Sequence, residues 1–231
     1  IHYKFGYKLM LSTLLDTAFK NIYNVLIGKF FSVQSLGFYE RSKEFSEYPS
    51  SMLIGVIGKV TYPMLSTIQD DPIRLGNIYR KLIRVSFFII APLILGLAGI
   101  GKPLILILLG EDWLPAVLFF QILCLAKVFY PVHAFNLDIL KVYGRSDLFL
   151  KLEIIKKTIV TISVIVAFQF GVLGLVFSSV FTSIASLFVN MYYSSKLINY
   201  PIKEQINDLT YILFQSLATG FLMYYIVNLT L

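Results

Sequence analysis

The stretch that decides the fold is TIVTISVIVAFQFGVLGLVFSSVFTSIASLFVNMYYSS, residues 158–195, because it contains no charged residue. The tight link Gln169-Phe170-Gly171-Val172 interrupts it and separates two predicted spans, about residues 149–168 and 173–193, each close to the roughly 20 residues that a helix needs to cross the hydrocarbon core. A surface helix of a soluble bundle would carry a polar face, and a membrane β-barrel would show shorter segments of alternating polarity. Residues 149–193 are therefore predicted to form a hairpin of two transmembrane helices.

The composition of the whole chain extends this prediction beyond the hairpin. Of 231 residues, 57% are hydrophobic and only 14% are charged, whereas about a quarter of a soluble domain is charged. The missing charged surface indicates that lipid covers much of the protein. We predict an all-α fold, a polytopic transmembrane helical bundle with almost no extramembrane mass. Its seven spans are expected at about residues 6–31, 37–68, 85–109, 116–142, 149–168, 173–193 and 206–227.

The basic residues give this bundle a predicted orientation. If the N-terminus is cytoplasmic, thirteen Lys and Arg residues fall in inner connections, and four fall in outer connections or outer helix ends. Cytoplasmic connections of membrane proteins carry such an excess, so we expect the N-terminus inside. Topology then explains the net charge of +7, and no nucleic-acid partner is needed. The inner residues are Lys4, Lys8, Arg74, Arg80, Lys81, Arg84, Lys141, Arg145, Lys151, Lys156, Lys157, Lys196 and Lys203, and the outer ones are Lys29, Arg41, Lys43 and Lys102.

Charged and polar side chains inside the first span are candidates for a functional site. A charge at the centre of a span costs about 2.5–3.5 kcal/mol on insertion scales, so it usually faces a cavity or a partner. Asp16 and Lys20 are four residues apart, in the favourable acid-before-base order, and Asn24 continues the same face. Two interpretations stay open: a local ion pair that lets the helix insert, or a polar stripe that lines a central pathway.

The second span begins with a cluster of charged residues. Arg41 lies three residues before Glu44, and Glu47 follows three residues later, so that neighbouring side chains can pair on one helix face. The cluster is either a solvated helix end or the lining of an outward-facing cavity at its mouth.

The fourth and sixth spans carry further polar side chains. Lys127 lies inside the fourth span, and His133 in the same span is either a proton relay or a hydrogen-bonded packing residue. The sixth span carries a stripe of small polar residues at four-residue spacing, which predicts helix–helix packing. It consists of Ser178, Thr182, Ser186 and Asn190.

Patterns for catalysis or cofactor binding do not appear in the sequence. It has no Gly-rich phosphate loop, no metal-spaced His/Cys cluster and no recognisable nucleophile motif. Cys124 is the single cysteine, which excludes an internal disulfide and a multi-cysteine metal site. The connections between the predicted spans are too short for an extramembrane catalytic domain. We therefore expect no enzyme activity, no cofactor and no metal.

Five short motifs follow one another along residues 24–147 and carry a family resemblance. They read NVLIGKFF (24–31), LGFY (36–39), PMLSTIQDD (63–71), GEDWLPA (110–116) and GRSD (144–147). This ordered set resembles the C-terminal half of bacterial polysaccharide flippases of the Wzx type, in the superfamily that also holds multidrug and toxic-compound extruders. Because the chain opens without an initiator Met or a signal peptide, we expect it to be an excerpt of a longer polypeptide.

The resemblance implies two six-helix lobes around a central cavity. Residues 1–200 would form the second lobe, and residues 201–231 an additional C-terminal transmembrane helix. The implied function is transport: a flippase that moves polyprenyl (undecaprenyl)-diphosphate-linked oligosaccharide across the bacterial inner membrane by alternating access, in lipopolysaccharide or other polysaccharide biosynthesis. The implied partners are that lipid-linked oligosaccharide, membrane lipid and other polysaccharide assembly proteins. The residues expected to line the route are Asp16, Lys20, Asn24, Arg41, Glu44, Glu47, Lys127 and His133.

Three other functions stay open at this point. The first is a drug or peptidoglycan-precursor transporter of the same superfamily. The second is a membrane-embedded polysaccharide polymerase or ligase, which should carry a large outer loop with catalytic residues that this sequence does not show. The third is a scaffold of an envelope assembly complex that transports nothing.

Overall fold

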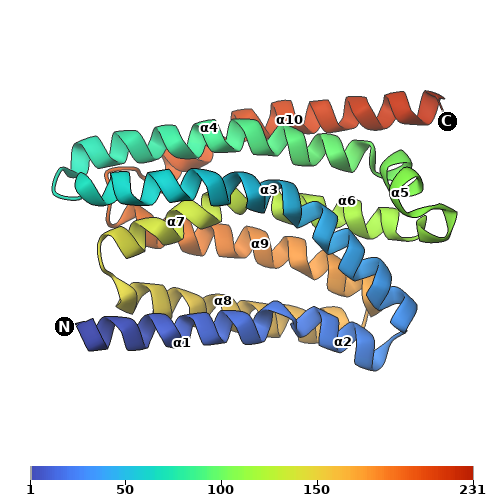
Figure 1. Ribbon diagram of the computed structural model, residues 1–231, viewed down its shortest axis with the longest axis horizontal. Helices are drawn as coiled ribbons and strands as arrows, with labels where there is room; N and C mark the ends of the chain where they lie inside the picture. The colour runs from blue at the N-terminus through green and yellow to red at the C-terminus, as the bar shows by residue number, and fades with distance from the viewer. Residues whose placement is uncertain (1, 231) are drawn as a thin grey trace.

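The structure, a computed structural model, is an elongated bundle of long helices packed side by side (Figure 1). It describes residues 2–230, and the side chains of residues 2–5, 8, 9, 20, 228 and 230 lie outside the described set. Its helices are α1 (His2–Lys20), α2 (Ile22–Phe30), α3 (Val33–Thr67), α4 (Pro72–Gly99), α5 (Gly101–Leu109), α6 (Ala116–Lys127), α7 (Tyr130–Val142), α8 (Ser146–Phe168), α9 (Gly171–Ser195) and α10 (Ile202–Thr230), with one 3₁₀ turn, Glu111–Trp113, between α5 and α6. The predicted all-α fold is confirmed.

Four helical segments of the described chain are long and apolar enough to cross a membrane by themselves. They are Pro72–Gly99, Ala116–Val142, Gly171–Ser195 and Ile202–Val227. The remaining long helices are α3, α8, and α1 followed by α2. They carry charged residues and lie alongside these four segments in the bundle (Figure 1). The chain is therefore a multi-pass membrane protein, as the composition predicts.

Successive long helices run in opposite directions, so that the connections between them lie at two ends of the bundle (Figure 1). The α3–α4, α7–α8 and α9–α10 connections lie at the end that holds the N-terminus, and the α5–α6 and α8–α9 connections lie at the other. Helix α1 packs along α8, α8 along α9, and α9 against α6 and α7, while α10 packs along α4. The connections that the sequence predicts to lie inside thus share one end with the N-terminus, although the orientation itself stays a prediction.

The predicted bounds of the third span, residues 85–109, are wrong. The helix begins at Pro72, where the side chain of Asp71 accepts a hydrogen bond from the backbone N–H of Arg74 at 3.0 Å and caps the first turn. It ends at Gly99, and α5 follows as a separate short helix. The basic residues near the start suggested a connection, but they lie within the helix.

Two other rods depart from straight helices. The predicted first span is interrupted at Asn21, between α1 and α2. Helix α3 bends along its length (Figure 1), and Pro49 lies inside it. A proline has no N–H for the helical hydrogen bond, which is a common cause of such bends.

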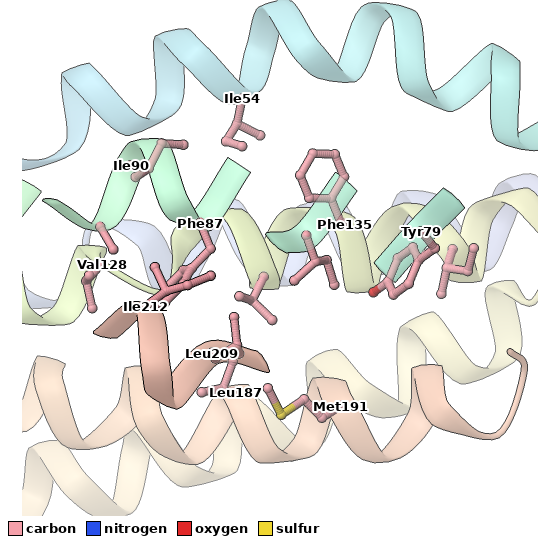
Figure 2. Close-up of a cluster of buried hydrophobic side chains, with 14 of the residues drawn as sticks. Ile54, Tyr79, Phe87, Ile90, Val128, Phe135, Leu187, Met191, Leu209 and Ile212 are labelled. Carbon is pink, nitrogen blue, oxygen red and sulfur yellow. The ribbon is translucent and has the colours of Figure 1, made fainter. Parts of the chain in front are cut away.

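The main core joins α3, α4, α7, α9 and α10 through apolar side chains. Figure 2 shows Ile54, Phe87, Phe135, Leu187 and Ile212 packed together, one from each of these helices. Lipid tails are as apolar as these side chains, so close packing and interhelical hydrogen bonds hold helices together in a membrane. One such bond lies inside this core: the Tyr79 hydroxyl donates to Asn136 Oδ1 at 2.9 Å, and both residues are fully buried.

Two glycines allow α10 to lie unusually close to α4. A Cβ added to Gly220 would stand 2.7 Å from the carbonyl oxygen of Leu95, and one added to Gly99 would also collide with the backbone of α10. Small residues at such crossings permit the backbone approach that membrane helices use for packing. The contact therefore depends on the absence of a side chain at both positions.

Candidate functional site

A polar cavity of about 420 Å³ lies inside the bundle, and seven helices contribute to its lining. They are α1, α2, α3, α6, α7, α8 and α9. The charged lining residues are Asp16, Lys43, Glu47, Lys127, Lys156 and Lys157. The uncharged polar ones are Tyr23, Tyr39, Tyr130, His133, Ser179, Thr182, Ser183 and Ser186. A cavity with this lining is unusual in a protein of such apolar composition.

The cavity lies near the middle of the bundle's length. Its lining residues on α9 fall between Ser179 and Ser186, in a helix of 25 residues that begins at Gly171. At a rise of 1.5 Å per residue, they stand roughly 12 to 22 Å from the start of that helix. Polar and charged groups at this depth are costly in lipid and mark a pathway or a binding site in membrane proteins.

An ion pair between α3 and α6 forms one wall. Lys127 Nζ donates to Glu47 Oε2 at 2.9 Å, and the two side chains are 24% and 27% exposed. Both belong to the set predicted to line the route. Lys127 of the predicted fourth span thus pairs with Glu47, the last residue of the charged cluster on the predicted second span. Glu47 therefore faces the cavity.

The opposite wall carries a group of charges on α1 and α8. Lys157 Nζ donates to Asp16 Oδ1 at 2.6 Å, and it lies 3.5 Å from Glu153 Oε2. Glu153 is only 3% exposed, and it also pairs with Lys156. A buried carboxylate between two lysines keeps both cations in a fixed place. The described partner of Asp16 thus lies on another helix, while a pairing with Lys20, one of the two interpretations of the sequence, stays a prediction.

His133 is held by hydrogen bonds at both ring nitrogens. The Ser183 hydroxyl donates to the carbonyl of Ala126 at 2.6 Å, so it accepts from His133 Nε2–H at 3.3 Å. On the other side of the ring, Asn190 Nδ2 donates to His133 Nδ1 at 2.9 Å. The network assigns the proton to Nε2 and fixes the ring, and one edge of the ring borders the cavity.

Helix α9 supplies most of the hydroxyl groups of the cavity. Its stripe was predicted to pack against other helices, and this holds for Ser178, which accepts a hydrogen bond from the Tyr23 hydroxyl at 3.1 Å while donating to the carbonyl of Leu175. Thr182 and Ser186 of the same stripe line the cavity instead. The four-residue spacing correctly predicts that these side chains share one helix face, but part of that face lines the cavity and does not pack against a helix.

The eight predicted site residues divide into three groups. Asp16, Glu47, Lys127 and His133 come together around the cavity, although they come from four helices. Asn24, Arg41 and Glu44 do not line it. Arg41 Nη1 donates to Glu44 Oε2 at 2.8 Å on the outer face of α3, with both side chains more than half exposed. The side chain of Lys20 lies outside the described residues.

Sequence reasoning did not place several residues that line the cavity. Lys156 and Lys157 were read as part of a basic inner connection, but they lie well inside α8. Their pairing with Glu153, three and four residues earlier, was the available signal. Tyr23 and Tyr39, whose rings lie 6.2 Å apart, carried no signal beyond their polarity inside a span.

The charges of the lining suit an anionic ligand. It has four lysines against two carboxylates, and an ammonium group in a desolvated site binds phosphate oxygens through charge-assisted hydrogen bonds. Hydroxyl groups on α9 and the tyrosines add donors and acceptors for a neutral polar ligand. In the described part of the chain, no group of three His, Cys, Asp or Glu residues could hold a metal ion.

Comparison with known proteins connects this bundle to one family. The family model described as polysaccharide biosynthesis protein matches residues 2–118, which include α1 to α5 and one side of the cavity. No solved structure gives a significant match.

The individual relatives come from polysaccharide gene regions and pathways. An "uncharacterized membrane protein in cps region" of Klebsiella pneumoniae is 33% identical over 122 residues, 53% of this chain and 25% of that protein. The teichuronic acid biosynthesis protein TuaB of Bacillus subtilis is 28% identical over 63% of this chain and 30% of its own length. The lipopolysaccharide biosynthesis protein WzxC of Escherichia coli is 22% identical over 80% of this chain and 39% of its own length.

These matches cover a minor part of each relative, between 25% and 39% of its length. They confirm the resemblance drawn from the five motifs, since WzxC is named for lipopolysaccharide biosynthesis and the family model covers half of the chain. The chain belongs to the polysaccharide biosynthesis protein family.

Proposed function

We propose that the chain is part of a flippase that moves a polyprenyl-diphosphate-linked oligosaccharide across the bacterial inner membrane. The single observation that carries this proposal is the cavity at mid-depth of the bundle, with four lysines and a row of hydroxyl groups in its lining. A lipid-linked oligosaccharide has both a strongly anionic diphosphate and many sugar hydroxyls. The two kinds of lining group match the two parts of this substrate.

Two of the lysines bind the diphosphate by exchanging it for a carboxylate. Lys127 is paired with the carboxylate of Glu47, and Lys157 with that of Asp16. An incoming diphosphate displaces these carboxylates from the lysines, and the carboxylates recover their partners when it leaves. Because the ion pairs return after each passage, the cationic site binds the diphosphate without retaining it.

The sugars of the substrate bind to the uncharged polar part of the cavity lining. Hydroxyl groups of Ser179, Thr182 and Ser186 point from one helix face, and such groups donate and accept hydrogen bonds equally well. This kind of lining tolerates different sugars, in keeping with relatives named for teichuronic acid, lipopolysaccharide and succinoglycan biosynthesis.

Transport requires that the cavity open to each side of the membrane in turn. Many transporters achieve this by rocking one half of the protein against the other around a site near the bilayer midplane. Residues 1–200 serve as one such half, with residues 201–231 as an additional helix beside it, and the rest of the protein completes the cavity. A transporter rather than an enzyme is also favoured by the relative named succinoglycan biosynthesis transport protein ExoT.

The proposal is tested in cells that depend on the complete protein for surface polysaccharide. Lys127→Gln together with Lys157→Gln should lower polysaccharide export by at least about tenfold, since each lysine supplies a charge-assisted hydrogen bond of roughly 1.5–3 kcal/mol. Lipid-linked repeat units should accumulate in the same cells. Lys59→Gln is the matched control, because Lys59 is exposed on α3 and does not line the cavity. Normal export by a well-expressed double variant would refute the role of the cavity.

A further inference from the structure

A second hollow lies on the outer side of the bundle, in the groove between α4 and α10. Its volume is about 610 Å³, and it is separate from the cavity described above, because it shares no lining residue with it. Nine residues line it: Asn77, Arg80, Lys81, Arg84, Val85, Phe88, Tyr211, Ile212 and Gln215. Three cations thus stand beside aromatic and aliphatic side chains in a groove of a membrane-embedded surface.

The α4 side of the groove changes from polar to apolar along the helix. Asn77, Lys81, Arg84 and Phe88 follow at the four- and three-residue spacings that keep side chains on one face. At 1.5 Å per residue this stripe is about 16 Å long. Its polar part lies nearer the end with the basic connections, and Phe88, which is 60% exposed, lies deeper.

The three cations are not equivalent. Arg80 is fixed by two carboxylates of α10: its Nε donates to Asp208 Oδ2 at 2.6 Å, and its Nη1 donates to Glu204 Oε2 at 2.5 Å. The Tyr200 hydroxyl also donates to Asp208, at 2.8 Å. Burial, aided by this hydrogen bond, raises the pKa of Tyr200, so the phenol stays protonated and remains a donor. Arg80 therefore holds α10 against α4.

Lys81 and Arg84 are the cations that remain available to a ligand. Both are exposed, and the structure describes no hydrogen bond or salt bridge from either side chain, while the Arg84 charge acts on the Asp208 carboxylate without a direct contact. They lie three residues apart, so their charged groups can reach one anion together. Beyond them, Phe88 and Tyr211, which is 69% exposed, offer an apolar surface to a chain that extends into the membrane.

We propose that this groove binds an anionic phospholipid, with the phosphate between Lys81 and Arg84 and an acyl chain along Phe88 and Tyr211. The cations match the charge of a phospholipid head group, and the apolar side chains beyond them match its acyl chain. A free phosphate would contact the cations but not the apolar side chains. The predicted cytoplasmic position of this end agrees, because the cytoplasmic leaflet carries the anionic lipids and basic pockets between helices bind their head groups.

The test counts phospholipids bound to the complete protein by native mass spectrometry in detergent. Added phosphatidylglycerol should bind at least about fivefold more tightly than phosphatidylcholine, the preference that one basic side chain near an anionic head group provides. Lys81→Gln with Arg84→Gln should remove this preference. Lys151→Gln with Lys196→Gln, two exposed cations on α8 and at the end of α9, should retain it.

Each alternative gives a different result. If another part of the protein covers the groove, no phosphatidylglycerol preference appears, or the two double variants behave alike, and the proposal fails. If the site serves a free anion, inorganic phosphate displaces phosphatidylglycerol, and Phe88→Ala leaves lipid binding unchanged, which also overturns it. For the phospholipid, Phe88→Ala weakens the binding of phosphatidylglycerol while inorganic phosphate has no effect.

Discussion

Lys127 and Glu47 are 80 positions apart in the sequence, yet their side chains meet at 2.9 Å on the wall of the central cavity. The pair ties α3 to α6 at a depth where an unpaired charge is costly. It also keeps the lysine in place for an anion. One contact therefore serves both the stability of the bundle and the proposed transport of a diphosphate.

The dual role of this pair predicts a coupled effect on stability. Glu47→Gln or Lys127→Gln alone should lower the free energy of unfolding by about 1–3 kcal/mol, because each leaves a partly buried charge without its partner. The double variant should lose less than the sum of the two. Denaturant unfolding of the complete protein in detergent measures this cycle. The exposed pair Arg41–Glu44 is the control, with changes of about 0.5 kcal/mol or less. Additive effects for Glu47 and Lys127 would show that the two charges do not interact.

The close approach of α10 to α4 predicts opposite effects of the same substitution at two helical glycines. Gly220→Ala should destabilise the protein by about 1–3 kcal/mol, since the new methyl group collides with the Leu95 carbonyl oxygen. Gly55→Ala, on α3, meets no atom within 4 Å, and alanine favours a helix by about 1 kcal/mol over glycine. Thermal unfolding should therefore separate the two variants in opposite directions. Equal melting temperatures would mean that α10 does not pack at this distance.

The rods of the bundle could largely be predicted from the sequence, because long apolar runs and the basic connections between them are local signals. The start of α4 was missed for the same reason. Its first turns carry Arg74, Arg80 and Arg84, which locally resemble a connection. This charged segment joins the bundle through contacts that are not local: Leu75, Tyr79 and Ile83 are fully buried, and Arg80 pairs with Asp208 and Glu204 on α10.

The cavity was predictable only in part, because its residues meet through contacts between distant helices. A mid-span charge predicts a partner or a cavity but does not identify it. Asp16 pairs with Lys157, which lies 141 positions away and gives no local signal. The sequence also does not show which face of a helix points toward the cavity. Arg41, Glu44 and Glu47 look like one cluster, yet α3 turns Glu47 to the cavity and leaves Arg41 and Glu44 on its outer face.

The shared end of the basic connections predicts which side of the membrane each loop occupies. With Cys124, which is buried, replaced by Ala, single cysteines at the exposed positions Asp70 and Arg145 should resist an impermeant thiol reagent applied to intact cells. Cysteines at Glu111 and Gln169, exposed at the opposite end, should react. Permeabilised cells, in which all four positions should react, provide the control. The reverse pattern in intact cells would place the N-terminus outside.

The central claim is that the lysines of the mid-membrane cavity carry the diphosphate of a lipid-linked oligosaccharide, and the most direct measurement is flipping itself. The complete protein is reconstituted into vesicles with a fluorescent polyprenyl-diphosphate oligosaccharide, and the rate at which label becomes accessible to an impermeant quencher is recorded. We predict flipping that falls at least about tenfold in the Lys127→Gln, Lys157→Gln variant and persists in Lys59→Gln. Equal rates for the double variant and the unaltered protein would contradict the account.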